Sequence, residues 1–308
     1  SISHEGVKDY LTGISKYKPR DYQIEGVTDA LQKNRRLIIS PTGSGKSLMI
    51  YAITRYHMEN QRSTLIIVPT TSLVEQMYKD FVDYGWNVED ICHKIYAGKD
   101  LMSKHPVIIS TWQSIYKLPK DWFNRFDVVI GDEAHQFKSK SLVSIMTKLY
   151  DTKYRYGFTG TLDGTQTHKW VLEGLFGPSY KIVNTKELQE KGYLATLNIK
   201  VLLLKHEPQV FDTYEDEVQY LIGHEKRNKF IKNLSWDLKG NTLILYSRVA
   251  THGEVLYDLI NTNERKIFFV HGGVDVEERE SVRQITDCLL YTSPSPRDVE
   301  ESRMPSSA

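Results

Sequence analysis

Cysteine is nearly absent from this chain, and so are the other features that set a protein apart from ordinary globular domains. Only Cys92 and Cys288 occur among the 308 residues, with no CxxC pair, so neither a disulfide framework nor a zinc site is indicated. No apolar run approaches the roughly 18 residues that cross a bilayer, and the first residues lack the pattern of a signal peptide. We therefore expect a cytoplasmic protein, in the host cytoplasm if the source is viral, with no membrane contact.

An excess of charge of either sign is also missing. Forty basic and 39 acidic residues leave a net charge of +1, which excludes a polycation that coats nucleic acid with its whole surface. The hydrophobic content of 40% and the charged content of 26% are typical of a folded globular protein. Any contact with nucleic acid is therefore expected to be local.

What the chain has is a series of short aliphatic runs separated by helical patterns. Strands are predicted at 37–39, 65–68, 107–109 and 128–130, and helices at 22–33, 48–59 and 72–84. The aliphatic runs are apolar throughout instead of alternating, which suits strands that are covered on both faces. The pattern predicts an α/β fold of the doubly wound type, with a parallel sheet flanked by helices.

Weaker signals follow residues 159–161 and predict a second domain, which the length of the chain also favours. Its predicted strands are 199–204, 243–246 and 267–270, and its predicted helices are 218–238, 254–261 and 276–285. We expect a first domain at 1–185, an interdomain connection at 186–198, an incomplete second domain at 199–287 and a tail at 288–308. Three prolines fall in that tail, which is expected to be disordered or non-native, the alternative being a native flexible terminus.

The segment SPTGSGKS follows the first predicted strand and leads into a predicted helix. Gly43 and Gly45 allow the backbone to curl so that its N–H groups converge on an anion, and the start of a helix favours negative charge. Lys46 adds a charge near the β and γ phosphates of a nucleotide, and Ser47 can bind Mg²⁺. We predict ATP and Mg²⁺ as cofactors, held by a loop that also includes Thr42 and Ser44.

A second buried strand, at 128–130, leads to two adjacent carboxylates in the sequence DEAH. Asp132 is the predicted Mg²⁺ ligand beside Ser47, and Glu133 is the predicted base that orients and deprotonates an attacking water. A solvated strand end is the simpler alternative, but the phosphate loop upstream favours hydrolysis chemistry.

The order of the motifs makes the prediction more specific than a phosphate loop alone. SPTGSGKS is preceded by Tyr22 and Gln23 and followed by VPTTSLVEQ, STWQS, DEAH and TGT. This series resembles the amino-terminal RecA-like motor domain of superfamily 2 helicases and translocases, which are P-loop NTPases. Segments such as IIVPTTSLVEQM, FVDYGW and VHGGVDVEERE are similar to the recombination helicases of bacteriophages, over residues 9–287.

The resemblance implies roles for five further residues. Gln23 is expected to read the adenine edge, with Arg20 adding a contact to the base or ribose. His135 is expected to lie between the nucleotide and the region that senses nucleic acid, and Thr159 and Thr161 to couple hydrolysis to domain movement. Without the motif series, Arg20 and Gln23 would be ordinary residues at a helix start, and His135 a packed or capping residue.

Contact with nucleic acid is predicted at two segments that each follow an apolar strand. In an open parallel sheet, ligands bind beyond the carboxyl ends of the strands, where hydroxyls and amides can bond phosphate oxygens without reading the sequence. The alternative is that the threonines only cap helices. We expect Trp112 to be a core residue and not a platform on which a base stacks. The predicted contacts are Thr70, Thr71, Gln76, Thr111 and Gln113.

The leading interpretation is an ATP-dependent DNA helicase or translocase that remodels or unwinds branched or single-stranded DNA in recombination and repair, as a monomer. Members of this superfamily carry arginine fingers in a later motif resembling QxxGRxxR, which we do not find here, so we expect a fragment of a longer helicase. A restriction-type motor subunit or an RNA helicase is an alternative. So is a nucleotide-dependent nucleic-acid-binding module without efficient turnover.

Overall fold

The protein divides into two compact units, Ser1–Tyr193 and Leu194–Ala308. The computed structural model describes residues 2–96, 100–162, 166–195, 198–261 and 266–275, together with 278, 279, 281, 282 and 285. Within these residues, none of the helices combines the length and the apolar character needed to cross a membrane. The predicted tail at 288–308 lies outside the described residues, as does much of the predicted helix at 276–285.

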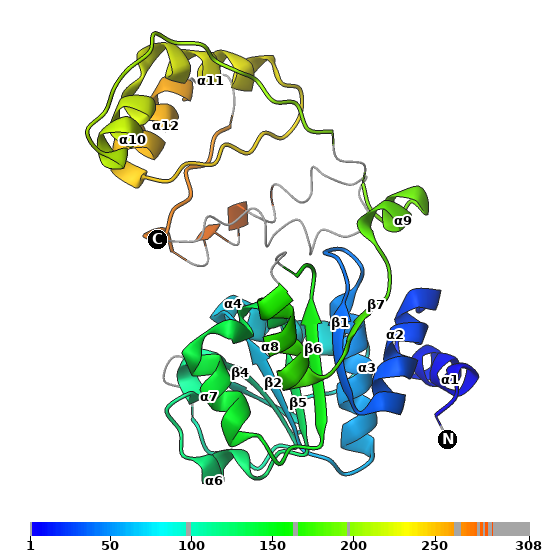
Figure 1. The fold of residues 1–308 in the computed structure, drawn as a ribbon. Coiled ribbons are helices and arrows are strands. Elements are labelled where there is room, and N and C mark those ends of the chain that lie inside the picture. The colour runs from blue at the N-terminus through cyan, green and yellow to red at the C-terminus, as the bar shows by residue number, and fades with distance from the viewer. Residues whose placement is uncertain are drawn as a thin grey trace. The chain divides into compact units, whose positions relative to one another are not determined.

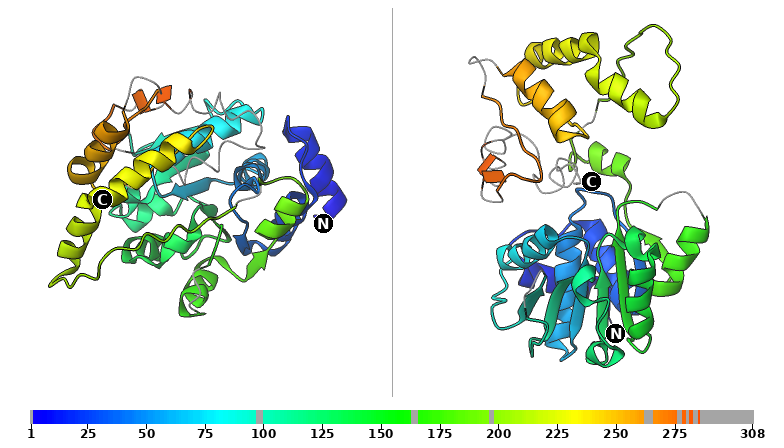
Figure 2. Two further views of the ribbon diagram at one scale, coloured as in Figure 1. Left: turned by 90° about the horizontal axis from the view of Figure 1, so that it is seen from above. Right: turned by 90° about the vertical axis from the view of Figure 1, so that its left-hand side faces the viewer.

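The first unit is built on a parallel sheet with the strand order β3-β4-β2-β5-β6-β1-β7. Helices cover both faces of this sheet, as the views in Figures 1 and 2 show. The strands are β1 (Arg35–Ile39), β2 (Thr64–Val68), β3 (Cys92–Ile95), β4 (Val107–Thr111), β5 (Val128–Gly131), β6 (Tyr154–Thr159) and β7 (Ser179–Lys181). The α/β prediction is confirmed, and the four predicted strands correspond to β1, β2, β4 and β5.

Ten helices are described in the first unit, and they include the three predicted at 22–33, 48–59 and 72–84. They are α1 (His4–Ile14), α2 (Asp21–Lys33), α3 (Lys46–Glu59), α4 (Thr71–Asp83), α5 (Trp112–Ile115), α6 (Lys120–Phe123), the 3-10 helix η1 (Ala134–Lys138), α7 (Lys140–Lys148), α8 (Gln166–Phe176) and α9 (Thr185–Glu190). Helix α9 begins just before the predicted connection at 186–198 and extends into it, and a capping box between Asn184 and Glu187 stabilises its start.

Two separate hydrophobic cores form because successive strand residues point to opposite faces of the sheet. In β2, Ile66 packs with α1 to α4 on one face, whereas Leu65 and Ile67 pack with α5, α7 and α8 on the other. All three side chains are fully buried. The apolar composition of the strands therefore follows from burial on both faces of the sheet.

Helices are the regular elements among the described residues of the second unit. Its elements are α10 (Tyr214–Gly223), α11 (Glu225–Asp237), the π-helix η2 (Val249–Gly253) and α12 (Glu254–Ile260). The single helix predicted at 218–238 is two helices, because the chain leaves the helical region at His224, where ψ is 106°. The His224 ring then accepts the Arg227 N–H at 3.2 Å and caps α11.

The strands predicted at 199–204, 243–246 and 267–270 are wrong for the structure: the described residues of this unit form helices and extended segments, and no strand. A strand requires a neighbour that pairs its backbone groups, and an apolar run alone does not supply one. The side chains of these runs remain accessible, with exposed fractions of 84% for Leu203 and 60% for Leu245.

Candidate functional site

The phosphate loop connects β1 to α3, as the motif predicts. Gly43 and Gly45 have φ values of 82° and 79°, a left-handed backbone that glycine adopts without steric cost. A Cβ atom on Gly45 would also collide with the Gln23 amide. Gly45 is the N-cap of α3, and no side chain caps this helix start. The amino end of this 14-residue helix therefore faces the loop without a side-chain cap, an arrangement that favours binding of an anion.

Strand order brings the acidic motif to the phosphate loop. β6 lies between β1 and β5, with Ile39 in register with Thr159 and Gly131 in register with Gly157. The phosphate loop, the residues after β5 and the end of β6 therefore meet at one edge of the sheet. The Ser40 N–H donates to the Thr159 carbonyl at 2.9 Å, which joins the start of the loop to the end of β6.

Lys46 and Glu133 form the central ion pair of this edge, with 2.9 Å between Nζ and Oε1. Both side chains are largely buried, with exposed fractions of 12% and 16%. Burial acts to raise the pKa of Glu133, but the hydrogen bond from His135 and the charge and hydrogen bond of Lys46 outweigh it and lower the pKa to about 2. Glu133 is thus a carboxylate at neutral pH.

The neighbouring Asp132 is in a different environment. Its side chain is buried, and Oδ1 accepts the Glu133 backbone N–H at 2.9 Å. Burial raises its pKa, while Lys46 acts in the opposite direction. The two carboxylates of DEAH therefore differ in burial, in hydrogen-bond partners and in the direction of their pKa shifts.

His135, Thr159 and Thr161 continue the chain of contacts that starts at Lys46. His135 Nδ1 lies 3.2 Å from Glu133 Oε2 and 3.1 Å from Thr159 Oγ1. The Thr159 hydroxyl donates to the Thr161 carbonyl at 2.8 Å, so toward His135 it accepts, and Nδ1 carries the proton. The motif residues DEAH and TGT are therefore connected by hydrogen bonds between side chains.

Gln23 contacts the phosphate loop directly. Its Nε2 donates to the Ser44 carbonyl at 2.9 Å, and its Oε1 accepts the Arg20 N–H at 2.9 Å. Arg20 donates to the Tyr22 hydroxyl, which in turn donates to the Ser44 carbonyl, each at 2.8 Å. The Arg20 guanidinium also lies 4.2 Å from the ring centroid of Tyr193. Both polar atoms of the Gln23 amide thus have partners within the chain. Recognition of a base by Gln23 stays a prediction.

Ser47 and Ser44 also have hydroxyl partners. The Ser47 hydroxyl lies 2.6 Å from the hydroxyl of Tyr84, and the Ser44 hydroxyl is paired with that of Ser40. Thr42 is exposed at the tip of the loop. The motif series includes Tyr22 without a role of its own and does not include Tyr84, so sequence reasoning missed the contacts of both. Nothing in the spacing of Tyr84 distinguishes it from the other 18 tyrosines of the chain.

The predicted nucleic-acid contacts gather beyond the ends of β2 and β4, which are neighbours in the sheet. Thr70 and Thr71 are exposed at the start of α4, where the Thr70 hydroxyl accepts the Leu73 N–H at 3.3 Å. Thr70 therefore caps α4, and its contact with nucleic acid stays a prediction. Gln113 is exposed and donates to the Pro69 carbonyl at 3.2 Å, which connects the two strand ends.

The remaining two predicted contacts are less accessible. Thr111 is buried, and its hydroxyl pairs with that of Ser114 at 2.9 Å. Gln76 is partly buried and donates to Asp80 at 2.8 Å within α4. Trp112 packs against the core on the α5 face, in agreement with the core interpretation. The exposed members of the set are therefore Thr70, Thr71 and Gln113.

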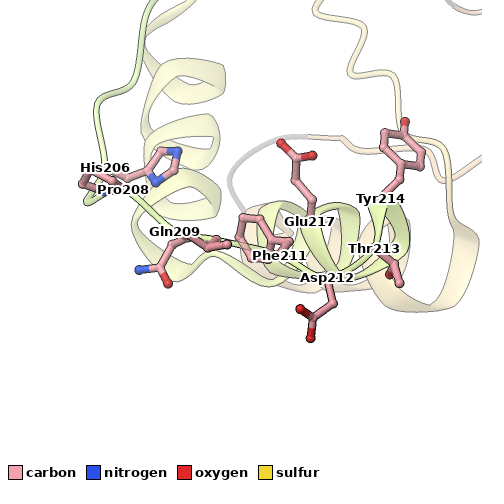
Figure 3. Close-up of a pocket in the computed structure, with 9 residues that line it drawn as sticks. His206, Pro208, Gln209, Phe211, Asp212, Thr213, Tyr214 and Glu217 are labelled. Atoms are coloured by element: carbon pink, nitrogen blue, oxygen red, sulfur yellow. The ribbon is translucent and has the colours of Figure 1, made fainter.

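A hollow in the second unit has a different character. It is lined by residues that include His206, Phe211, Asp212 and Glu217. Figure 3 shows the carboxylates of Asp212 and Glu217 pointing in opposite directions. Diverging acids neither attract a phosphate nor surround a cation, so this hollow offers no chemistry comparable with that of the sheet edge.

A RecA-like parallel sheet with a phosphate loop after β1 and a carboxylate pair after β5 defines the class of this protein. Residues 16–164 match the family of the type III restriction enzyme res subunit. The sequence is 34% identical over 293 residues to the ATP-dependent DNA helicase uvsW of Enterobacteria phage T4, which covers 91% of this chain and 58% of that protein. It is 32% identical over 193 residues to the DNA 3'-5' translocase XPB2 of Sulfurisphaera tokodaii, covering 61% of this chain and 40% of that protein.

The crystal structure of the UvsW helicase from bacteriophage T4 has a TM-score of 0.54 to this chain and is 34% identical in sequence. The match covers 59% of this chain and 68% of that structure. The chain belongs to the superfamily 2 helicases, and the resemblance stated from the motifs is confirmed. It spans 58% of the length of the phage T4 relative in sequence.

Proposed function

We propose that this chain is the ATP-hydrolysing part of a DNA helicase or translocase that remodels branched or single-stranded DNA. The observation that carries the proposal is the contact of Lys46 with Glu133, at 2.9 Å, between the loops that follow β1 and β5. The lysine proposed to bind phosphate and the carboxylate proposed to act as base are therefore in contact at the sheet edge. The match to a protein described as an ATP-dependent DNA helicase supports the choice of ATP and DNA.

The residues present are suited to Mg²⁺ with ATP. Hydroxyl and carboxylate oxygens, as in Ser47 and Asp132, are the ligands that this hard cation prefers. Among the described residues there is no group of three or more acidic, histidine or cysteine side chains that could hold a metal, so phosphate oxygens would have to supply further ligands. When bound, the nucleotide would supply the phosphoryl group, and the metal would neutralise part of the charge on its oxygens.

Lys46 and Glu133 are positioned to act in sequence. The Lys46 ammonium group is paired with the Glu133 carboxylate. To bind phosphate oxygens it must break this contact or share its N–H donors between the carboxylate and the phosphates. Since Lys46 helps to hold the pKa of Glu133 low, its transfer to phosphates would raise the proton affinity of Glu133. Nucleotide binding would thereby prepare the carboxylate to accept a proton from an attacking water.

We further propose that residues 1–185 form the first motor domain and that 199–287 begin the second, joined by the connection at 186–198. DNA would contact the exposed residues Thr70, Thr71 and Gln113 beyond β2 and β4. The N–H groups at the start of α4 and the neighbouring hydroxyls suit phosphate oxygens and carry no preference for sequence.

The experiment compares ATP binding and hydrolysis, with and without branched DNA, in the wild-type chain, Lys46→Ala and Glu133→Gln. We expect Lys46→Ala to weaken nucleotide binding. We expect Glu133→Gln to retain binding and to lose hydrolysis by about 10²- to 10⁴-fold, because an amide cannot accept the proton. DNA-stimulated hydrolysis that survives both substitutions would contradict the proposal.

Glu59→Gln is the matched control for loss of an ion-paired carboxylate. Glu59 pairs with Arg55 at 2.8 Å at the far end of α3, away from the phosphate loop. We expect this variant to hydrolyse ATP at the wild-type rate.

A restriction-type motor is a second candidate, favoured by the match of residues 16–164 to the res subunit family. Stimulation by linear duplex DNA and not by branched DNA would select it, and stimulation by RNA alone would select an RNA helicase. Tight ATP binding with negligible turnover on any nucleic acid would instead select a nucleotide-dependent binding module.

A further inference from the structure

Tyr84 is a residue outside the motif series that bonds to the phosphate loop. It is the C-cap residue of α4, and its hydroxyl lies 2.6 Å from the hydroxyl of Ser47. The two residues are 37 positions apart in sequence, and Tyr84 is only 6% exposed. A buried tyrosine hydroxyl needs a polar partner, and here that partner is the serine at the start of α3.

The ring of Tyr84 is held firmly in place. Its centroid lies 5.2 Å from that of Tyr51 and 5.8 Å from that of Tyr17, which meets it edge-on. Its backbone carbonyl accepts the Lys16 N–H at 3.2 Å, and its own N–H donates to Asp80. Packing on several sides leaves the Tyr84 hydroxyl little freedom, so it acts as a fixed partner for Ser47.

A fixed partner matters because a serine hydroxyl can otherwise rotate among three staggered positions. The group has one O–H donor and two lone pairs. When its O–H points at Tyr84, both lone pairs of Ser47 are directed elsewhere and remain able to bind a cation. A hydrogen bond to Tyr84 and metal ligation by Ser47 are therefore compatible.

We propose that Tyr84 is a positioning residue for Mg²⁺ binding, which orients the Ser47 hydroxyl from the end of α4. The inference rests on the proposed function, in which Ser47 is a magnesium ligand. A neutral hydrogen bond between side chains is worth about 2- to 10-fold in an equilibrium constant. Loss of the Tyr84 hydroxyl therefore affects the requirement for magnesium by about that factor and leaves the phosphate contacts of the loop intact.

The test uses Tyr84→Phe in the full chain, with binding of a fluorescent ATP analogue as the readout. Titrations are made in excess Mg²⁺, in EDTA, and at fixed nucleotide with increasing Mg²⁺. We expect the half-saturating Mg²⁺ concentration to rise about 2- to 10-fold, with metal-free nucleotide affinity unchanged. In a Ser47→Ala background, Tyr84→Phe has no further effect on the magnesium dependence, because the oriented group is gone.

Tyr51→Phe is the matched control. It removes a hydroxyl from the same aromatic cluster, but this hydroxyl donates to the Ile14 carbonyl at 2.6 Å and not to the phosphate loop. We expect its magnesium dependence to equal that of the wild type. Circular dichroism of each variant verifies the fold.

The outcomes separate the inference from the proposed function. If the wild-type chain binds nucleotide with magnesium and Tyr84→Phe needs no more magnesium than it does, the positioning role is wrong. A lower magnesium requirement in Tyr84→Phe would mean that Tyr84 competes with the metal, which also overturns it. A wild-type chain that takes up no nucleotide with magnesium would overturn the proposed function itself.

Discussion

Glu133 has a backbone conformation that few residues other than glycine adopt, with φ and ψ both at 49°. A left-handed conformation costs such a residue of order 1 kcal/mol, and it persists only where the surroundings impose it. The surroundings here are Lys46 and His135, which lie 2.9 and 3.2 Å from the two carboxylate oxygens. The direction of the carboxylate is thus set by the backbone together with the contacts of its two oxygens with Lys46 and His135.

His57 is a second residue whose surroundings determine its state, at the far end of α3. It is 1% exposed, with Nε2 at 3.0 Å from the Tyr156 hydroxyl and Nδ1 at 3.2 Å from the Arg62 guanidinium. Burial, and then the charge of Arg62, lower its pKa from 6.5 to about 3. The folded chain therefore keeps this imidazole neutral where an unfolded chain would protonate it.

This difference predicts a loss of stability as the pH falls. Between pH 6.5 and about 3 the unfolded state binds one more proton at His57 than the folded state does. The free energy of unfolding therefore decreases with falling pH through that window, by about 1.4 kcal/mol per unit well inside it. We expect wild type to lose about 1 kcal/mol more than His57→Gln between pH 7 and 5.5 in urea unfolding.

The control for this measurement is His93→Gln, on the edge strand β3. It keeps His57 and should show the pH dependence of the wild type. Equal pH dependence of wild type and His57→Gln would contradict the buried neutral imidazole.

At the scale of elements, glycines in β5 and β6 make room for the aromatic layer beneath the site. A Cβ atom on Gly131 would lie 2.7 Å from the Phe137 ring, and one on Gly157 would lie 2.8 Å from the Phe176 ring. These two rings meet edge-on, with 5.0 Å between centroids. Because η1 begins at Ala134 within DEAH and contains Phe137, this packing also fixes where η1 leaves the sheet.

Gly157→Ala should therefore destabilise the protein. A methyl group forced against the Phe176 ring costs about 1 to 3 kcal/mol of the free energy of unfolding. Chemical denaturation measures the loss. We expect Phe176→Leu to relieve part of it, so that the double variant is more stable than the sum of the single effects predicts.

Gly174→Ala is the contrasting control, since nothing lies within 4 Å of a Cβ atom at this position in α8. Here alanine should stabilise the protein by about 0.5 to 1 kcal/mol, because it reduces the freedom of the unfolded chain. If both glycine variants changed stability in the same direction, the steric explanation would be wrong.

Some elements were predictable from the sequence and others were not, for identifiable reasons. β2 and β5 are aliphatic except for Thr64 and Gly131 at their ends, so these strands could be predicted directly. β6 was missed because its sequence, YRYGFT, contains a buried arginine, whose guanidinium donates to the carbonyls of Leu149 and Thr152. These two carbonyls lie six and three residues before the arginine, and a pattern of apolar runs does not predict such a pairing.

The candidate site shows the same division. Parallel strands predict that Lys46 and Glu133 share an edge, but their direct contact depends on β6 lying between β1 and β5. The contact of Ser47 with Tyr84 depends on how α4 crosses α3, for which the chain offers no local signal. The motifs therefore predicted that Lys46 and Glu133 lie near each other. The tertiary arrangement determines which of their atoms are in contact.

At the scale of the whole molecule, all the residues of the proposed hydrolytic site belong to the first unit. The sheet and both hydrophobic cores also lie within Ser1–Tyr193. A unit that contains its own core and its own site is expected to fold and to bind nucleotide independently.

A chain of residues 1–193 should therefore be folded and should bind ATP with magnesium about as tightly as the whole chain. Thermal unfolding followed by circular dichroism, and titration with a fluorescent nucleotide, measure the two properties. Lys46→Ala in the same short chain is the control for specific binding. A short chain that is unfolded, or that is folded and takes up no nucleotide, would show that the first unit is not autonomous.

All seven strands are parallel, and the residues proposed to bind ATP or DNA lie at the carboxyl ends of strands. The rim formed by the amino ends of the strands, opposite the phosphate loop, contains none of these residues. The exposed turn at Asn60 and Gln61, between the end of α3 and β2, lies on that rim. A dye or a surface tether attached there would leave the working rim open to solvent. This turn is thus a suitable attachment site for single-molecule measurements of the chain on DNA.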